Sequence, residues 1–407
     1  MKAANFSLSL PANEDEQAND DEQANDQGAD WHEFPDDIMI DIIKRLNTID
    51  RLILSGVCKS WRRLAKQKDI PVHQFPLIMF PREANCKDVE FRDCSTYRTF
   101  IYNLPECIFQ TGARCFGSTK GWLLIETVEQ SKRPQISMLN PISGEIIKLP
   151  SITPFQSNKS YSSYMYTSVD AFLSEVDFFF LSLSCRIISA IFHDGILAIC
   201  RAGDDEWRII VEAEQFNFFG DMCFFEGTIY VLYKFSNYDD NVVLQHEVKF
   251  SETSTITIKL IPHPYRSQVF EENGSVVNDS VDTYMVQSEG ELLVIDRVLV
   301  CSAIDDYPSF ERLKYDVYKV IDGCVSSKKR DLKTDRIVFT GGGPSLSVSA
   351  KDFNESVKGN CIYFLDEVNK YGVNFPGIWW LDDGRTTYLC PPIKFADKMT
   401  WLMPSIV

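Results

Sequence analysis

Five segments between residues 120 and 365 share one pattern, in which a polar residue and a glycine precede a strand-like apolar run. The five glycines are Gly121, Gly195, Gly227, Gly290 and Gly359. Glycine beside polar residues is typical of a tight turn, and the alternating or continuous apolar residues that follow are typical of a β-strand. A strand unit that repeats along the chain restricts the fold more than any other feature of this sequence.

The intervals between these glycines are 74, 32, 63 and 69 residues. Each interval is close to either once or twice a unit of about 32–37 residues. We interpret the longer intervals as two units, of which one copy of the pattern has degenerated. Radial sheets explain such a repeat better than a pair of β-sandwiches does. The sequence therefore predicts a mainly β fold, a propeller of about seven blades, with six to eight compatible.

Residues 34–65 have a helical period instead. Pro35 suits the first helical position, and Asp36 and Asp37 favour the positive end of a helix dipole. The run Asn-Thr-Ile-Asp at 47–50 supplies capping residues for a second helix. Ile38, Ile42, Ile43 and Leu46 form one apolar stripe of the first helix, and Leu52 falls on the buried side of the second. The inward stripe of a third helix is expected to hold Val57, Cys58, Trp61, Leu64 and Ala65. Three short helices make a small core, so this all-α module needs a partner or a neighbouring domain.

Charge divides the chain into blocks. The formal net charge is −17, of which residues 1–30 carry −7, whereas residues 31–68 carry +3. The first block holds the hexamer DEQAND twice in tandem and no apolar residue larger than alanine in that repeat, which favours a disordered acidic leader. We expect three parts: the leader at 1–30, the helical module at 31–70 and the propeller at 76–403.

Composition also excludes several classes of protein. An acidic chain lacks the basic footprint of a general nucleic-acid binder. The twelve cysteines form no C-x-x-C pair, so we expect reduced, buried thiols, no metal and no cofactor. No secretory signal and no apolar run of membrane-spanning length is present. We therefore expect an intracellular protein of the nucleus and/or cytoplasm, with no membrane partner.

Catalytic motifs are likewise absent. The five histidines are isolated, and the pairs Asp204-Asp205 and Asp382-Asp383 lie beside turn residues rather than at catalytic spacing. The triple glycine at 341–343 lacks the lysine of a phosphate-binding loop and precedes Pro344, so we expect a strand-connecting turn that the glycines loosen. The sequence predicts no catalytic residue, and the rival class of a propeller enzyme has no recognisable constellation to support it.

The helical segment resembles an F-box, the adaptor-binding module of ubiquitin-ligase substrate receptors. Phe34 stands where that family usually has leucine, and the match continues without a gap through an Asp50-x-Leu52 bridge to Val57-Cys58-x-x-Trp61. The resemblance implies that a Skp-family adaptor covers apolar residues which the three helices leave exposed. It assigns adaptor binding to Phe34, Pro35, Ile38, Ile42, Leu46, Leu52, Val57, Cys58 and Trp61.

Two alternatives stay open within this module. Trp61 serves either as an adaptor contact or as internal core, because a three-helix module can use one side chain for both. The basic residues of the third helix would suit a DNA recognition helix, but the acidity of the chain and the F-box spacing favour a solvated or adaptor-facing edge. These residues are Lys59, Arg62, Arg63 and Lys66.

Residues 76–403 resemble the KIB-type β-propeller of a large plant F-box family, formerly a domain of unknown function. The segments that carry this are KGWLLI, LNPISGEIIKLP, FGDMCFFEGTIYVL and the stretch from IVFTGGGPSLSVSAKDF to GIWWLDDGRTTYL. The two resemblances imply a non-enzymatic substrate receptor of a Skp–cullin–F-box ubiquitin ligase, with an unidentified target protein on the propeller. The alternative is a binding or sequestering module without ligase turnover.

Overall fold

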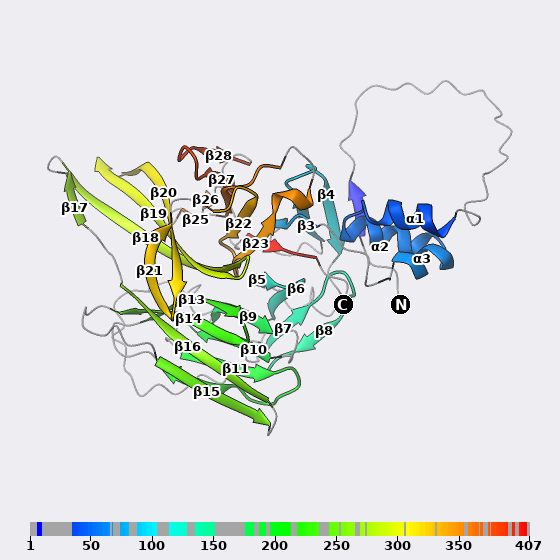
Figure 1. Cartoon of the computed structure of the whole chain (residues 1–407), viewed down its shortest axis with the longest axis horizontal. Coiled ribbons are helices and arrows are strands. Elements are labelled where there is room, and N and C mark those ends of the chain that lie inside the picture. The colour runs from blue at the N-terminus through cyan, green and yellow to red at the C-terminus, as the bar shows by residue number, and fades with distance from the viewer. Residues whose placement is uncertain are drawn as a thin grey trace.

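The structure is a computed structural model of the 407-residue chain (Figure 1). It describes residues 6–9, 35–65, 67, 74–80, 88–103, 114–127, 135–150, 176–182, 187–192, 196–212, 218–235, 244–251, 254–264, 269–272, 275–304, 307–329, 332–353, 357–365, 367–368, 373–374, 376–389, 393–394 and 399–404.

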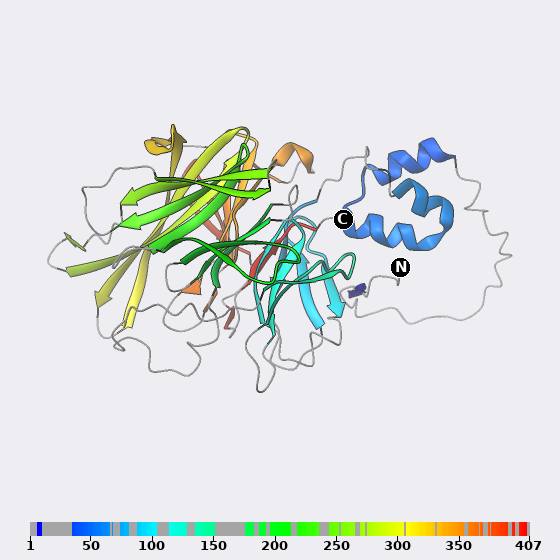
Figure 2. The ribbon, with the colours of Figure 1, turned by 90° about the horizontal axis from the view of Figure 1, so that it is seen from below.

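Six sheets are arranged as the blades of a propeller (Figures 1 and 2). The first blade comprises β5 (Arg114–Thr119), β6 (Trp122–Thr127), β7 (Gln135–Leu139) and β8 (Ile146–Lys148). The second comprises β9 (Val176–Ser182), β10 (Ile187–Phe192), β11 (Ile196–Arg201) and β12 (Arg208–Glu212). The third comprises β13 (Phe218–Phe225), β14 (Thr228–Phe235), β15 (Leu244–Ser251) and β16 (Ser254–Pro264).

The later blades have five strands each. The fourth comprises β17 (Val269–Glu272), β18 (Ser275–Ser288), β19 (Glu291–Ile304), β20 (Tyr307–Ile321) and β21 (Cys324–Lys329). The fifth comprises β22 (Arg336–Thr340), β23 (Leu346–Ser349), β24 (Cys361–Phe364), β27 (Gly377–Trp380) and β28 (Thr386–Tyr388). The sixth comprises β1 (Phe6–Ser9), β2 (Leu77–Phe80), β3 (Asp88–Asp93), β4 (Thr99–Asn103) and β30 (Thr400–Leu402).

Smaller elements complete the described chain. A separate three-stranded sheet holds β25 (Glu367–Val368), β26 (Val373–Asn374) and β29 (Ile393–Lys394), and a 3-10 helix spans Ala350–Asp352. The F-box-like segment forms α1 (Asp36–Ile43), α2 (Thr48–Val57) and α3 (Lys59–Ala65), at one side of the propeller. The mainly β fold with a small N-terminal all-α module is confirmed.

The strand β1 lies inside residues 1–30, for which the sequence predicts a disordered leader. Phe6–Ser9 pairs antiparallel with β4 at the edge of the sixth blade, so these four residues differ from the expectation. The other residues of the leader, including the repeated hexamer, lie outside the described residues.

Adjacent blades meet through the strands that lie nearest the centre of the propeller, most of which are end strands of their sheets. Contacts join β30 to β5, β5 to β9, β9 to β13, β13 to β18, and β18 to β23. The blades differ in size: β18, β19 and β20 have 14, 14 and 15 residues and extend away from the F-box helices. These innermost strands therefore form a ring from which blades of unequal length radiate.

The recurring glycines form hairpin turns within the blades. Lys120–Gly121, Glu226–Gly227 and Glu289–Gly290 each have two positive φ angles, as the two central residues of a type I′ turn do. Gly359 has another role, because a Cβ there would lie within 2.7 Å of Asp335 Cα. Gly195 lies outside the described residues. The local pattern thus encodes tight hairpins at three of the five glycines, Gly121, Gly227 and Gly290.

Each of the five patterns belongs to a successive blade. The interpretation that the longer intervals hide degenerate copies is therefore wrong, because every interval spans a single blade of variable length. The sixth blade carries no copy of the pattern, since it is assembled from both ends of the chain. The propeller accordingly has six blades, within the expected range of six to eight and one fewer than the seven we favoured.

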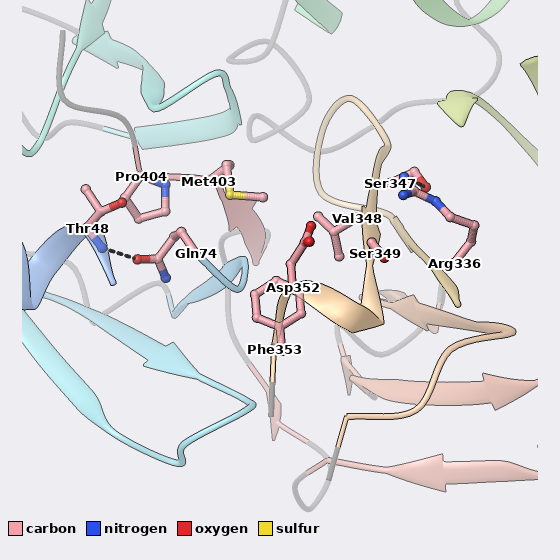
Figure 3. Close-up of a pocket in the computed structure, with 10 residues that line it drawn as sticks. All are labelled: Thr48, Gln74, Arg336, Ser347, Val348, Ser349, Asp352, Phe353, Met403 and Pro404. Atoms are coloured by element: carbon pink, nitrogen blue, oxygen red, sulfur yellow. Dashed lines mark hydrogen bonds between the residues drawn. The ribbon is translucent and has the colours of Figure 1, made fainter. Parts of the chain in front are cut away.

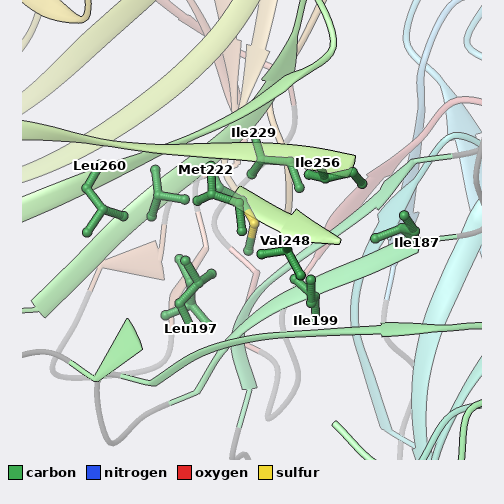
Figure 4. Close-up of a cluster of buried hydrophobic side chains, with 11 residues drawn as sticks. Ile187, Leu197, Ile199, Met222, Ile229, Val248, Ile256 and Leu260 are labelled. Atoms are coloured by element: carbon green, nitrogen blue, oxygen red, sulfur yellow. The ribbon is translucent and has the colours of Figure 1, made fainter. Parts of the chain in front are cut away.

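Apolar side chains fill the spaces between blades. In β11, Leu197 and Ile199 face the third blade, whereas Ala198 and Cys200 face the first. Figure 4 shows Leu197 and Ile199 gathered with Met222 and other side chains of the third blade. Successive residues of a strand point to opposite faces, so a blade buried on both faces requires the continuous apolar runs seen in the sequence.

The C-terminal strand closes the ring. β30 pairs antiparallel with β2, with Leu402 opposite Leu77 and Thr400 opposite Met79. Trp401 is buried between the fifth and sixth blades, and its indole nitrogen donates a hydrogen bond to the Thr340 carbonyl oxygen at 2.9 Å. The last described strand of the chain is therefore joined to the first strand after the F-box helices.

The triple glycine connects β22 and β23, as expected of a strand-connecting turn. It does not loosen the loop, because the loop lies against the backbone of neighbouring segments. Thr400 Oγ1 donates a hydrogen bond to the Gly342 carbonyl oxygen, and Gly117 lies close to the same oxygen. Glycine is required at this junction because a side chain at Gly342 would overlap Met399 and Thr400 near β30, and one at Gly343 would crowd Ser118 of β5.

Replacing Gly342 by alanine is expected to lower the free energy of unfolding by at least about 2 kcal/mol more than replacing Gly144 by alanine. Both residues have φ near +70°, at 67° and 71°. An added Cβ at Gly342 would lie 2.8 Å from Thr400 Cα and would overlap the Met399 carbonyl oxygen, whereas Gly144 has no neighbour within 4 Å. Urea unfolding followed by fluorescence measures the difference, and equal losses would contradict a packing role for Gly342.

Candidate functional site

The first two helices of the F-box-like segment start at residues suited to helix ends. Pro35 precedes α1, and its carbonyl oxygen accepts a hydrogen bond from the Met39 amide at 3.1 Å. Asn47 caps α2, because its side-chain oxygen accepts from the Asp50 amide at 2.9 Å. The predicted cap at residues 47–50 is thus present.

The core that these helices share is very small. Among the described residues, the fully buried members of this core are Met39, Ile43 and Leu64, with Ile40, Leu54 and Trp61 partly buried against them. Such a core stabilises three helices weakly, so other contacts must hold the module together.

Four large apolar side chains on α1 and α2 remain exposed. Ile38 and Ile42 are 47% and 39% exposed, and Ile53 and Val57 are 44% and 60% exposed. Each pair is spaced i, i+4, so each lies along one face of its helix. Such side chains gain free energy when a partner covers them, and we take them as the candidate partner-binding surface, here called the exposed apolar face.

The exposed apolar face changes two expectations. Val57 does not point inward as the predicted stripe of the third helix requires, and it ends α2 rather than belonging to α3. Ile53 was missing from the predicted adaptor-binding residues. Its i, i+4 spacing to Val57 was the signal in the sequence that identifies it.

The remaining predicted adaptor-binding residues occupy varied positions. Pro35 is exposed, and Leu46 and Cys58 are half-buried. Cys58 lies between α2 and α3, where its sulfur accepts a hydrogen bond from the Trp61 amide at 3.5 Å. Trp61 is half-buried, so it is partly internal core and partly accessible. Phe34 and the side chain of Leu52 lie outside the described residues.

Two of the basic residues of α3, Arg62 and Arg63, are engaged within the module. Arg62 donates a hydrogen bond to the Ser55 carbonyl oxygen at 2.9 Å, and Arg63 pairs with Asp36 of α1 at 2.6 Å. Lys59 is exposed, and Lys66 lies outside the described residues. These contacts favour a structural edge of the F-box over a DNA recognition helix.

A cavity of about 310 Å³ lies where α2, the fifth blade and the C-terminal strand meet (Figure 3). Figure 3 shows Thr48 and Gln74 on one side of it and Arg336 with Ser347 on the other. Arg336 Nη2 donates to Ser347 Oγ at 3.0 Å. The described lining residues supply a guanidinium, a carboxylate and hydroxyl groups but no imidazole or thiol, so among them the usual pair of nucleophile and base is not found.

A buried histidine–carboxylate pair, His263 with Asp296, was not predicted from the sequence. His263 Nε2 lies 3.0 Å from Asp296 Oδ1, and Thr283 Oγ1 donates to the same oxygen at 2.9 Å. Both groups bind the carboxylate rather than each other, so the threonine has no contact with the imidazole that would act as its base. The cluster joins the third and fourth blades, and no sequence spacing links residues 33 positions apart.

The acidic pairs form turns, as predicted. Asp204 Oδ2 accepts from the Arg201 amide at 2.8 Å, and Asp383 Oδ1 accepts from the Arg385 amide at 3.0 Å. Buried cysteines are also poor nucleophiles, because burial raises the pKa of the Cys223 and Cys361 thiols to about 12. Both thiols are therefore neutral at pH 7.

Within the described ranges, no group of three or more His, Cys, Asp or Glu side chains is arranged to hold a metal ion. No described helix has the length and apolar character needed to cross a bilayer.

Comparison with known proteins follows the same division of the chain. The KIB1-4 beta-propeller family model matches residues 90–379, and the F-box domain model matches residues 31–73. The chain belongs to the KIB1-4 beta-propeller family. It combines this propeller with an N-terminal F-box, as predicted from the two resemblances.

Named plant proteins share this similarity over most of their length. The F-box protein SKIP23 of Arabidopsis thaliana is 22% identical over 385 residues, which cover 83% of this chain and 84% of that protein. The putative F-box protein At5g14160 of Arabidopsis thaliana is 22% identical and covers 67% of this chain and 69% of its own length. These relatives, together with the two family models, support a plant F-box protein with a KIB-type propeller.

Proposed function

We propose that this chain is the substrate-recognition subunit of a Skp–cullin–F-box ubiquitin ligase. The observation that carries the proposal is the exposed apolar face on α1 and α2, in a segment that the F-box model matches. A Skp-family adaptor covers this face and connects the chain to a cullin-RING ligase. The propeller binds the target protein.

The mechanism we propose needs no bond-making residue in this chain. Holding a target near a recruited ubiquitin-conjugating enzyme raises the effective concentration of the target's lysines. The protein is accordingly a receptor and not an enzyme, and it acts inside the cell, in the nucleus and/or cytoplasm. Buried, unpaired cysteines support a reducing compartment, among them Cys200, Cys223 and Cys361.

Replacing Ile42 and Val57 together by aspartate is expected to weaken adaptor binding at least about 100-fold. Each substitution places a charge where an apolar side chain enters a partner pocket, and truncating such side chains costs about 2 kcal/mol or more each. Because both residues are exposed, the fold of the free chain is retained. Titration calorimetry with a purified Skp-family adaptor measures the change.

Ile209→Asp in the propeller is the matched control, because Ile209 is 40% exposed, nearly the same as Ile42. It is expected to leave adaptor affinity unchanged. Full affinity of the double variant would contradict the proposal. Sequestration without turnover is the function to adopt if the chain binds the adaptor but the proteins bound by its propeller keep the same abundance when the proteasome is inhibited.

A further inference from the structure

The two ends of α2 have opposite surroundings. Thr48, Ile49 and Arg51 at its start are buried, whereas Ile53 and Val57 toward its end belong to the exposed apolar face. The buried end lies against the propeller. A helix of ten residues is about 15 Å long and behaves as a rigid rod.

Ile49 is buried in the core between the sixth and first blades. It packs in one cluster with Phe91 and Phe100 of the sixth blade and with Leu123 of the first. A side chain of the F-box is thus part of a propeller core. This contact attaches α2 to the propeller, but one apolar contact leaves its direction free to vary.

A forked ion pair fixes that direction. Arg98 Nη1 donates to Asp50 Oδ2 at 2.6 Å and Nη2 donates to Asp50 Oδ1 at 2.8 Å. The Arg98 guanidinium also lies 5.1 Å from the centre of the Phe100 ring. The hydrogen bonds to Asp50 raise the pKa of Arg98 above its usual range. Two parallel hydrogen bonds constrain orientation as well as distance.

A third contact joins α2 to the segment that follows the F-box. The Thr48 amide donates to Gln74 Oε1 at 2.9 Å, as Figure 3 shows, and Gln74 Nε2 donates to the Phe75 carbonyl oxygen at 2.6 Å. The Phe75 ring packs edge-on against Phe339 and Tyr363, at 5.2 and 5.4 Å. The end of the connecting segment is therefore anchored between the fifth and sixth blades.

We infer that Arg98 and Gln74 are positioning residues, which hold α2 so that the exposed apolar face keeps one direction relative to the propeller. Three contacts at separate points of the helix start, through Thr48, Ile49 and Asp50, suffice to orient a rigid rod. If the proposed function is correct, the adaptor and the target are held at a fixed separation, which raises the effective concentration of the target at the ligase.

Distance measurement by electron spin resonance tests the inference on the full chain. Spin-labelled amino acids are incorporated genetically at Lys59 of α3 and Asp205 of the second blade, both exposed. The wild-type chain is expected to give one narrow distance distribution. Gln74→Ala with Arg98→Ala is expected to broaden it at least twofold, and Arg98→Ala alone to have an intermediate effect.

Arg92→Ala is the control, because Arg92 forms its ion pair within its own strand, with Glu90 at 3.0 Å. It is expected to leave the distribution narrow. A second pair of labels within the propeller, at Asp205 and Lys358, reports whether the variants keep their fold, and its distribution is expected not to change. A narrow Lys59–Asp205 distribution in the double variant would overturn the inference.

Adaptor affinity separates this inference from the proposed function. Because Arg98 and Gln74 are not among the four residues of the exposed apolar face, all the variants are expected to bind the adaptor within about twofold of wild type. If wild type itself binds no adaptor, the proposed function fails, while the distance distributions still decide the role of Arg98 and Gln74.

Discussion

Replacing Trp401 by alanine is expected to lower the free energy of unfolding by about 3–5 kcal/mol. Trp401 is buried, and its ring packs edge-on against Phe339 at 4.9 Å. The substitution leaves a large cavity and removes the hydrogen bond to the Thr340 carbonyl oxygen. Trp401 belongs to the three-residue strand β30, so the substitution removes packing contacts from the strand that closes the ring. The midpoint of urea unfolding measures it.

Trp380→Ala is the matched control. Trp380 is half-buried, and its indole nitrogen donates to Thr387 Oγ1 at 3.0 Å within a single blade. Its replacement is expected to cost less than half as much as that of Trp401. If both variants lose the same free energy of unfolding, the burial of Trp401 in the closing strand does not contribute more to stability than the half-buried Trp380 does.

A fragment spanning residues 31–70 is expected to show no cooperative thermal unfolding. Within its described residues, the core of this fragment holds Met39, Ile43 and Leu64 as fully buried residues, whereas Ile49 and Asp50 have their partners in the propeller. Chains of about 40 residues usually need additional stabilisation to fold. Circular dichroism during heating and the dispersion of amide signals in nuclear magnetic resonance measure this.

Addition of the adaptor to the fragment is the informative comparison. Helical signal is expected to rise when the adaptor covers the exposed apolar face, even though Ile49 stays uncovered. A sigmoidal melting curve for the fragment alone would contradict the dependence of the F-box on the propeller. The full chain, in which Ile49 is buried, provides the reference signal.

Local features of this protein follow directly from its sequence. The Asn47 cap and the paired positive φ angles at Lys120–Gly121 depend on residues a few positions apart, so their chemistry is visible in the sequence. The same is true of the turns at Asp204 and Asp383. Such features require only short-range steric and hydrogen-bonding preferences.

Burial in the F-box was predicted less well. Periodicity placed Ile38, Ile42 and Ile43 on one apolar stripe, but only Ile43 is buried. The stripe of a short helix is wide enough to cover both a core and a second partner, so the period does not show which residues face inward. The structure distinguishes the buried Ile43 from the exposed Ile38 and Ile42, because it shows which side chains the neighbouring helices cover.

The sequence by itself determined the two kinds of module and the hairpins inside the blades, since those depend on neighbouring residues. Only the tertiary structure decided the number of blades, because the sixth blade unites strands from the two ends of the chain. The same holds for Arg98 with Asp50, which lie 48 residues apart. Closure of the ring sets which distant residues meet, and spacing along a chain does not encode that closure.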